Sequence, residues 1–466
     1  MPELIDERSA RQRYVHAALA SYLGSMSIGM ALGYSSPVGE YFEKKVHLNK
    51  STFGSILTIG ALAGGLIASL PAERFGRKTT ILGTTVLFSI GWILILLQSN
   101  AVMCYVARFI LGLASGIDCM VIPVYLGEVS TPERRGVLGT GHQFSIVLGV
   151  FIAYCLGSVI EPRSLTAACL VPVAATAAIM VFMPESPTWL VKSGKSNNQV
   201  MDALYFLFGQ TVYADAQREV LVDAKGQESG DFTITDLVNP SVLKPLSLAL
   251  SLMFLQQMSG INALIFYMKD IFASARTTLN ENVEAIIIGG IQVAFTVPAA
   301  IVIDRAGRRL LLHVSCIVEV LGLALLILYY NNQELGHRLS FLPVTALSLY
   351  VAGFSVGYGP IPWLMMSELL PVRVRGFGTG LCTAFNWLCA FLVTQFFDSI
   401  SKEVGNAGVF GIFLGIAAVG GVYVFLFLPE TKGKTVEEIE AMFRDSRFDG
   451  SVATVESSYY DHMQIQ

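Results

Sequence analysis

The feature that most constrains the fold is a succession of about twelve apolar runs, each long enough to cross a bilayer. A membrane-spanning helix needs roughly 20 mostly apolar residues. The 466 residues are 53% hydrophobic and 14% charged, whereas soluble chains carry about 25% charge. The runs fall in two sets of six, at 15–37, 53–72, 79–98, 102–126, 138–160 and 165–184, then at 244–267, 284–303, 309–330, 341–367, 377–397 and 406–428. We therefore expect an all-α membrane protein with twelve transmembrane helices in two six-helix bundles.

A polar stretch separates the two sets of runs. Within 196–224, charged residues accompany Leu204, Phe206 and Leu207 at helical spacing, which is typical of short amphipathic helices; a disordered linker is the alternative. The expected organisation is an N-terminal tail, a first bundle, a helical linker between the halves, a second bundle and a C-terminal tail, bounded at 1–14, 15–184, 185–243, 244–428 and 429–466.

Basic residues are distributed unevenly between the connecting segments. They gather in the loops that follow even-numbered runs: Arg74, Arg77, Lys78, Arg134, Arg135, Arg305, Arg308, Arg309, Arg373 and Arg375. Cytosolic loops carry such an excess, so both termini and the 185–243 stretch are expected in the cytosol, with the plasma membrane as the expected location. Asn49 begins the one proline-free N-x-Ser/Thr sequence and is a predicted glycosylation site in the first outer loop.

The two halves repeat short charged motifs at matching places. Residues 73–78 (ERFGRK) after the second run match 304–309 (DRAGRR) after the eighth, and 184–187 (PESP) after the sixth match 429–433 (PETKG) after the twelfth. A parallel repeat of six-span halves, with a site between them, is typical of transporters. We expect the charged members to form a cytosolic gate that ties the halves together when that side is closed; simple anchoring by positive charge is the alternative. The predicted gate residues are Glu73, Arg77, Glu128, Arg135, Glu185, Asp304, Arg308, Glu368, Arg375 and Glu430.

The seventh run contains three primary amides, Gln256, Gln257 and Asn262. An unpaired amide in an apolar setting costs roughly 2–7 kcal/mol. A straight helix, at about 100° per residue, would point Gln256 and Asn262 about 120° apart. The pair Ser259-Gly260 permits a local break. Because non-helical backbone at membrane depth is tolerated where it lines a cavity, the run predicts an uncharged polar cleft.

Further amides and an indole lie in runs of both halves: Gln143 in the fifth, Gln292 in the eighth, Trp363 in the tenth and Asn386 in the eleventh. Two prolines in 359–363 (GPIPW) interrupt the tenth run. Each residue alone could be a packed core group, but together they predict a binding site. Amides both donate and accept hydrogen bonds, which suits a neutral, hydroxyl-rich solute. An anionic solute would require Lys or Arg at membrane depth, and the second-half spans offer none beyond their first residues.

Several other classes of protein are not indicated. Residues 194–196 (GKS) and 433–435 (GKT) resemble the end of a phosphate-binding loop, but Trp189 and Leu428 stand where that loop needs its first glycine. The seven cysteines and six histidines lack metal-ligand spacing. We expect no enzyme activity, no cofactor, no metal and no nucleic-acid partner.

Taken together, the motifs resemble the sugar porter family of the major facilitator superfamily, over nearly the whole chain. The motifs that carry the resemblance are 73–78, 304–309, Arg108, 124–128 (VYLGE), 184–187, 256–262 (QQMSGIN), 359–363 and 429–433. The resemblance implies alternating access around a central sugar site. The sugar contacts it implies are Gln143, Gln256, Gln257, Asn262, Trp363 and Asn386, with Gln292 where glucose carriers have asparagine.

Some residues depart from the pattern of glucose carriers. Ser355 replaces a frequent glutamate before the GPIPW turn, and Tyr154 replaces a frequent glutamine. Residues 33–37 and 127–136 are similar to insect trehalose and sugar carriers and to their vertebrate intracellular relatives. The expected function is facilitative transport of glucose or a related hexose by a monomer. A trehalose carrier, a proton–sugar symporter and a non-transporting sugar sensor are the alternatives.

One position bears on proton coupling. The resemblance implies that proton-coupled members carry a carboxylate after a Gly-Tyr or Gly-Phe pair in the first helix, opposite an arginine of the fourth. Here Ser35 follows Gly33-Tyr34, and the arginine is Arg108. Serine does not titrate, so uniport is predicted. Asp118, about 15 Å beyond Arg108 along a helix, is the alternative coupling residue because intramembrane carboxylates are commonly functional.

Overall fold

The computed structural model describes residues 2–131, 135–209, 212–227, 239–275, 277, 279–332, 339–371, 374–434 and 436–443, and these contain helices and no strand. The first half consists of α1 (Pro2–Gly33), α2 (Ser35–Val46), α3 (Lys50–Ile67), α4 (Ser69–Phe75), α5 (Arg77–Leu96), α6 (Ala101–Glu128), α7 (Arg135–Val159), α8 (Pro162–Ala168) and α9 (Leu170–Met180). Between the halves lie α10 (Pro187–Lys192), α11 (Asn197–Phe208) and α12 (Val212–Gln227). The second half consists of α13 (Pro240–Met258), α14 (Ile261–Ala275), α15 (Glu281–Ala306), α16 (Arg308–Asn331), α17 (Leu342–Val356), α18 (Ile361–Leu369) and α19 (Arg375–Phe427), followed by α20 (Val436–Ala441).

Twelve spans follow from these helices. Eleven segments are long and apolar enough to cross a membrane. The last of them, α19, has 53 residues and is broken at Gly405, whose φ of 75° lies in the left-handed region that glycine tolerates. It therefore supplies two spans. The all-α prediction, the two sets of six and the short helices between them are confirmed.

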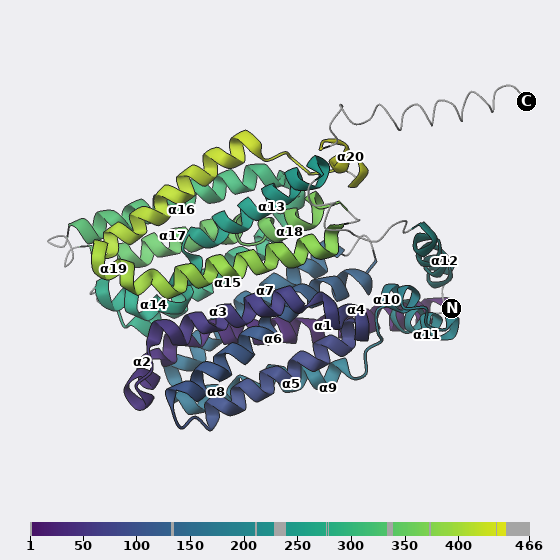
Figure 1. Cartoon of the computed structure of the whole chain (residues 1–466), viewed down its shortest axis with the longest axis horizontal. Helices are drawn as coiled ribbons and strands as arrows, with labels where there is room; N and C mark the ends of the chain where they lie inside the picture. Colours follow the sequence, from purple (N-terminus) through teal and green to yellow (C-terminus); the bar gives the residue numbers. More distant parts are fainter. Residues whose placement is uncertain are drawn as a thin grey trace, which may run out of the picture.

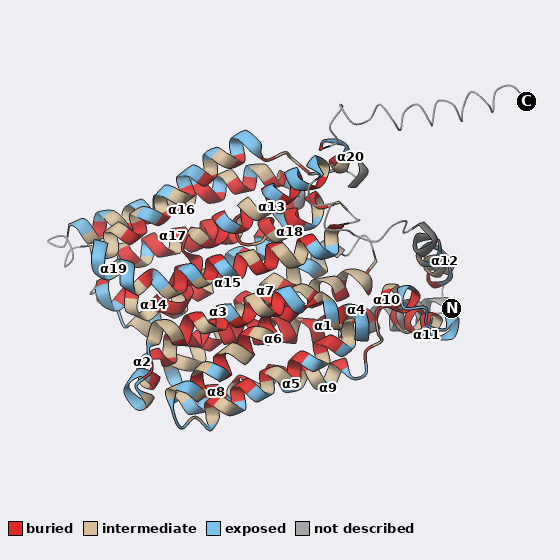
Figure 2. Ribbon diagram, viewed as in Figure 1, coloured by how far each residue is buried: buried red, intermediate tan, exposed pale blue. Residues whose placement is uncertain are grey.

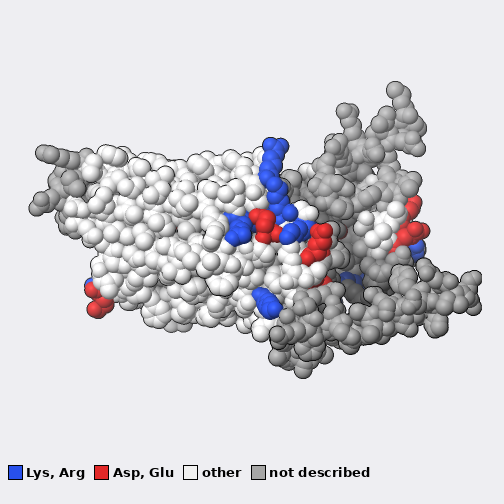
Figure 3. Space-filling view, turned by 90° about the horizontal axis from the view of Figure 1, so that it is seen from above, with Lys and Arg blue, Asp and Glu red and all other residues white. Residues whose placement is uncertain are grey.

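The halves form two adjacent bundles (Figure 1). Helices α10–α12 and α20 lie at one end, and α2, α8 and α14 lie towards the other. Buried residues fill the bundle interiors, whereas the outward helix faces alternate between exposed and intermediate residues (Figure 2). In the view of Figure 3, charged side chains gather near the α10–α12 end and a wide uncharged surface extends from them, as expected for a face that meets lipid.

Within the first bundle, α3 and α6 approach so closely that glycine is required on both. A Cβ added at Gly112 would collide with the carbonyl oxygen of Leu57, and one added at Gly116 with that of Ala61. Gly60 on α3 faces the backbone of α6 in the same way. Small residues let membrane helices pack backbone against backbone.

We therefore expect Gly112→Ala to destabilise the protein by about 1–3 kcal/mol, the usual cost of overpacking. The matched control is Gly83→Ala on α5, where an added Cβ meets nothing within 4 Å and helix propensity gains up to about 1 kcal/mol. Thermal unfolding of the purified variants measures both. Equal melting temperatures for the two variants would contradict the close packing.

The bundles meet along two seams. On one, Gly65 of α3 packs against Thr383 of α19, and on the other Gly289 of α15 packs against Phe151 of α7. Away from α10–α12, polar bonds also join the halves. Lys50 pairs with Asp270 at 2.5 Å, and the Tyr154 hydroxyl donates to the Ile265 carbonyl at 2.7 Å.

Candidate functional site

The site begins at a break in the seventh span, as predicted. Helix α13 ends at Met258, Gly260 adopts a φ of 100°, and α14 begins at Ile261. Ser259 caps the break, because its hydroxyl donates to the Gln256 carbonyl at 2.8 Å. The Tyr350 hydroxyl donates to the Ser259 carbonyl at 3.0 Å. The freed backbone groups thus have partners without water.

Four amides around this break form one continuous chain of hydrogen bonds. Asn262 Nδ2 donates to Gln257 Oε1 at 2.6 Å, and Gln257 Nε2 donates to Asn386 Oδ1 at 3.0 Å. Asn386 Nδ2 donates to Gln256 Oε1 at 2.7 Å. All four side chains are buried. The break therefore brings Asn262 beside the two glutamines, which a straight helix would not do.

The chain of amides ends on the interruption in the tenth span. Helix α17 ends at Val356 and α18 begins at Ile361, so the predicted break at the GPIPW sequence is confirmed. Gln256 Nε2 donates to the carbonyls of Tyr358 at 2.8 Å and Gly359 at 2.9 Å. Two broken helices are thus joined by one glutamine.

Three of the seven predicted contact residues lie on other helices, outside this chain as far as the described residues show. Gln143 is half-buried on α7, and Gln292 is buried on α15, the two helices that meet at one seam. Trp363 is half-buried on α18 against an apolar cluster that includes Met253 and Cys382.

Two buried polar groups of α19 have no hydrogen-bond partner among the described residues. They are the Trp387 indole N–H and the Thr383 hydroxyl, four residues apart and so on one helix face. Thr383 faces Gly65 across the seam. An unmade buried hydrogen bond costs about 1–3 kcal/mol, so a hydroxyl-bearing solute would be favoured here.

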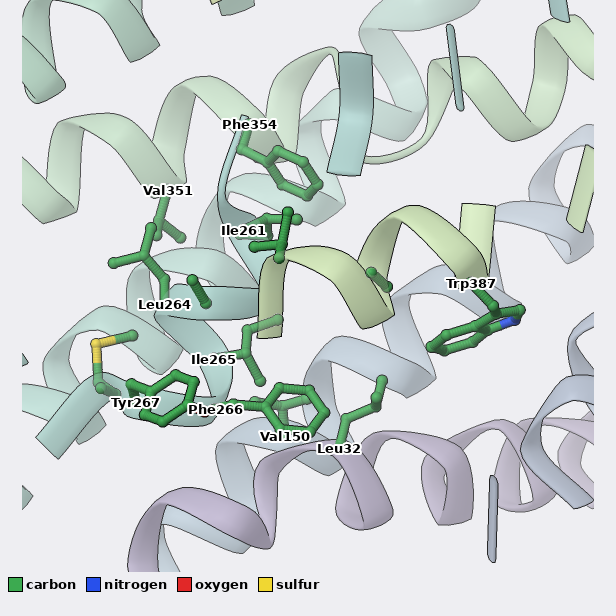
Figure 4. Packing of buried hydrophobic residues seen from close by; sticks show 14 of the residues in the cluster. Leu32, Val150, Ile261, Leu264, Ile265, Phe266, Tyr267, Val351, Phe354 and Trp387 are labelled. Carbon is green, nitrogen blue, oxygen red and sulfur yellow. The ribbon is translucent and has the colours of Figure 1, made fainter. Parts of the chain in front are cut away.

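Apolar side chains of α14 lie between the halves (Figure 4). Helix α14 is towards the end opposite α10–α12 (Figure 1). Phe266 lies against Val150 of the first half, and Leu264 lies beside Val351 of the second. A Cβ at Gly54 of α3 would come within 3.0 Å of the Phe266 ring. The short helix α14, which carries Asn262, therefore packs against both halves beside the amides.

Arg108 lies opposite Ser35, the position predicted to bear on proton coupling. Its Nη2 donates to Ser35 Oγ at 2.5 Å, Nη1 to the Ala31 carbonyl at 2.7 Å and Nε to the Phe53 carbonyl at 3.1 Å. The buried guanidinium is thus held by neutral acceptors. Asp118 is separate, since its Oδ1 accepts a hydrogen bond from Thr84 at 2.7 Å.

The charged motifs of the first half fasten neighbouring spans to each other. Arg77 pairs with Glu128 at 3.0 Å. The Glu185 carboxylate accepts the backbone N–H groups of Arg77 at 2.8 Å, Lys78 at 3.0 Å and Thr79 at 3.3 Å. It therefore caps the first turn of α5, where a negative charge is favoured.

The second half repeats this arrangement. Arg308 pairs with Glu368 at 2.8 Å, and Glu430 Oε1 and Oε2 accept the N–H groups of Arg308 and Arg309, each at 3.0 Å. Burial alone would raise the pKa of Glu430, but the donated backbone N–H groups, that of Lys432 first, outweigh it and hold the pKa below its usual range. A carboxyl with a lowered pKa stabilises the fold at neutral pH and loses that contribution only as pH falls through the lowered value.

Not every predicted gate residue joins these pairs. Glu73 is exposed, and its carbonyl accepts the Trp189 indole N–H at 2.7 Å. Arg375 donates to the Leu370 carbonyl at 3.2 Å. The side chains of Arg135 and Asp304 lie outside the described part of the structure. The pairs of Arg77 and Arg308 each join spans of the same half in this structure, so a gate between the halves stays a prediction.

Two six-span halves with a buried, uncharged chain of amides at two broken helices indicate a membrane transporter. Residues 12–443 match the model of the family described as "Sugar (and other) transporter". The chain belongs to this family, and its relatives are transporters, not enzymes.

Several known proteins are similar to this chain. A bovine relative named "Solute carrier family 2, facilitated glucose transporter member 8" is 38% identical, with 93% of this chain and 95% of the relative covered. The facilitated trehalose transporter Tret1 of Anopheles gambiae is 37% identical over 91% of this chain, which spans 55% of that relative. The structure of the proton:xylose symporter XylE bound to 6-bromo-6-deoxy-D-glucose has a TM-score of 0.79 at 23% identity, covering 93% of this chain and 99% of that one. The major facilitator fold is thereby confirmed.

The structure also contains contacts that the sequence did not indicate. Tyr358 meets Gln256 through its backbone carbonyl, which carries no residue-type signal. Tyr350, on α17, donates its hydroxyl hydrogen bond to the Ser259 carbonyl at the break between α13 and α14. Glu319, by contrast, carries the same signal as Asp118, a carboxylate inside an apolar run, and was not among the predicted residues.

Proposed function

We propose that this protein is a facilitative carrier for glucose or a related hexose, working by alternating access. The observation that carries the proposal is the buried, uncharged chain of four amides at two broken helices. Amides offer donors and acceptors together, and the unpartnered Trp387 N–H and Thr383 hydroxyl add more. Sugar hydroxyls match this pattern, whereas the fully buried guanidinium of Arg108 is already held by Ser35 and two carbonyls. Gln143, Gln292 and Trp363 are proposed as further contacts.

The test is uptake of labelled sugars by purified protein in liposomes. We expect saturable uptake of labelled glucose, with counterflow when the liposomes are preloaded with unlabelled glucose. Empty liposomes and the Gln256→Ala variant serve as controls. Counterflow also separates a carrier from a sugar sensor, because a sensor binds without exchange.

Trehalose is the second candidate solute, because the trehalose-named and glucose-named relatives are almost equally identical to this chain. Including labelled trehalose and fructose in the same panel decides between them. Uptake of trehalose at a higher kcat/KM than glucose would replace the hexose proposal.

We infer uniport because the acceptors that hold Arg108 among the described residues, Ser35 Oγ and two backbone carbonyls, include no carboxylate. An imposed pH gradient is then expected to leave sugar at its equilibrium distribution. Accumulation driven by the gradient, and lost in Asp118→Asn, would make the protein a symporter with Asp118 as the coupling group.

The paired charges at the α10–α12 end are proposed to hold each bundle together while the halves move, and to form the gate on this side. We expect Glu368→Gln to shift the population towards the state open at this end. An exposed pair contributes about 0–1 kcal/mol, and the Arg308–Glu368 pair is mostly buried, so a shift of several-fold is expected.

A cysteine introduced by Gly380→Cys, beside Gly65 at the seam between the halves, reports the opening by its labelling rate. Glu40→Gln, which breaks the exposed pair with Lys44, is the control; equal labelling in both variants would contradict the gate.

We place the α10–α12 end in the cytosol, because basic residues gather in the loops at that end, and the plasma membrane is the proposed location. Asn49 is exposed, and its side chain accepts the Thr52 N–H as the cap of α3. Its side-chain amide nitrogen is the proposed glycan attachment point on the outer side. Surface biotinylation and a glycosidase-sensitive mobility shift, lost in Asn49→Gln, test both.

A further inference from the structure

A second carboxyl group is buried in the second half, and the proposed transport cycle does not use it. Glu319 lies in the middle of α16 and is fully buried. An ionised carboxylate at membrane depth is costly unless it is paired or protonated. No cation is hydrogen-bonded to Glu319 among the described residues, so its hydrogen bonds decide its state.

Those hydrogen bonds converge on one hydroxyl. Ser315 Oγ lies 2.8 Å from Glu319 Oε1 and 2.8 Å from the Gly353 carbonyl oxygen. The same Oγ accepts the backbone N–H of Tyr358 at 3.1 Å. Glu319 Oε2 has no hydrogen-bond partner among the described residues.

Counting protons identifies the state that satisfies these contacts. A serine hydroxyl has one proton and two acceptor sites, so Ser315 cannot donate to both oxygens. If Glu319 is protonated, its O–H donates to Ser315 Oγ, and the Ser315 proton goes to the Gly353 carbonyl. Every contact then has a donor. If Glu319 is ionised, the single Ser315 proton can go either to Glu319 Oε1 or to the Gly353 carbonyl oxygen, and the other oxygen has no donor. Glu319 Oε2 would then carry buried negative charge without a hydrogen-bond partner among the described residues.

The same serine holds the turn on which the amide chain ends. Ser315 Oγ accepts the backbone N–H of Tyr358, and Gln256 Nε2 donates to the carbonyl of the same residue. Both side chains are therefore hydrogen-bonded to the backbone of Tyr358. A Cβ at Gly357 would collide with Ser315 Cβ, which shows how closely the turn rests on α16. If the Ser315 hydroxyl reorients, its hydrogen bond to Tyr358 changes, and Tyr358 is itself the partner of Gln256. The position of Gln256 therefore depends on Ser315 through one intervening residue.

We propose that Glu319 is a proton-binding positioning residue, which in its protonated form fixes the 357–360 turn through Ser315 and keeps Gln256 in place for the sugar. The inference rests on the proposed sugar site and extends it. Loss of the proton weakens sugar binding. By linkage, sugar then favours the protonated form by the same factor.

Other titratable groups surround Glu319 and have to be separated from it. Tyr350 on α17, Tyr358 in the turn and Cys316 on α16 interact with it electrostatically. Helix α19 meets this region through Gly420 and Gly421, which carry no titratable side chain.

The test is the affinity of the purified protein for labelled glucose, measured across mildly acidic to alkaline pH. For the unaltered protein we expect affinity to fall as pH rises through the titration of Glu319, by at most about tenfold per pH unit, the limit for one linked proton. Glu319→Gln keeps a donor to Ser315 and cannot titrate. We expect it to bind as the unaltered protein does at acidic pH, and to keep that affinity at alkaline pH.

Two controls separate Glu319 from its neighbours. Tyr358→Phe removes a hydroxyl that has no partner among the described residues, and Asp118→Asn removes the buried carboxyl of the other half; both are expected to retain the alkaline fall. Ser315→Ala is expected to weaken binding at every pH and to lose the fall. A flat profile in the unaltered protein, or an alkaline fall that persists in Glu319→Gln, would overturn the inference. Absence of glucose and trehalose binding at any pH would instead refute the proposed function.

Discussion

The Gln256→Ala variant is expected to lose sugar uptake completely while the protein stays folded. Gln256 donates to two carbonyls of the tenth span and accepts from Asn386. Removing its amide leaves those buried groups unpaired, at about 1–3 kcal/mol for each. It also removes one proposed sugar contact, and each 1.4 kcal/mol lost there weakens binding about tenfold.

The measurements for Gln256→Ala are equilibrium binding of labelled glucose and uptake in liposomes. Size-exclusion chromatography and thermal unfolding show whether the variant is folded, and a lowered melting temperature is expected. Gln98→Ala, just after the end of α5 and away from the amide chain, is the matched control with unchanged uptake. Normal sugar affinity in folded Gln256→Ala protein would refute the assignment of the site.

The Ser35→Asp variant is expected to gain proton-driven uptake. Ser35 Oγ lies 2.5 Å from Arg108 Nη2, so an aspartate there places a carboxylate against a buried guanidinium. Separating that pair during the transport cycle requires a proton, because an unpaired buried carboxylate is costly. A pH difference of about one unit, worth about 1.4 kcal/mol per proton, would then support up to about tenfold accumulation of sugar.

The comparison is made in liposomes at zero membrane potential with the interior alkaline. Ser35→Asn has the same size as the aspartate and no charge, so it is expected to behave like the unaltered protein and to equilibrate sugar only. If Ser35→Asp transports sugar but does not accumulate it, the opposition of residues 35 and 108 is insufficient for coupling. Accumulation by the unaltered protein would show that another group, such as Asp118 or Glu319, already couples protons.

The spans were predictable because hydropathy and charge act over about 20 residues at a time. The two helix breaks were predictable too, since Ser259-Gly260 and the prolines of 359–363 disfavour a continuous helix. The boundary between the last two spans is marked only by Gly405, because α19 continues as one helix on either side of it. The fold therefore follows mainly from local patterns.

The site was predictable only in part. Gln256, Gln257, Asn262 and Asn386 were singled out because buried amides need partners, and they meet one another. Which backbone groups they bind depends on how distant spans pack, which residue types do not encode. Tyr358 illustrates this, since its carbonyl is the partner of Gln256. The ion-pair partners of the charged residues could not be predicted either. The motif places Arg308 at the membrane edge, but it does not indicate whether Arg308 pairs with Glu368 or with a residue of the other half.

The carboxylate that caps α5 has a consequence for how the protein is made. Glu185 binds the N–H of Arg77 across a sequence separation of 108 residues, and Glu430 binds that of Arg308 across 122. Each carboxylate follows directly after the last span of its half. Because the ribosome adds residues in order, the first turn of α5 has no Glu185 cap until the sixth span has been synthesised. The first turn of α16 likewise has no Glu430 cap until the twelfth span has been synthesised. Each bundle is therefore completed by the last segment of its half to be synthesised, so a nascent chain that stops within a half lacks the cap of that half.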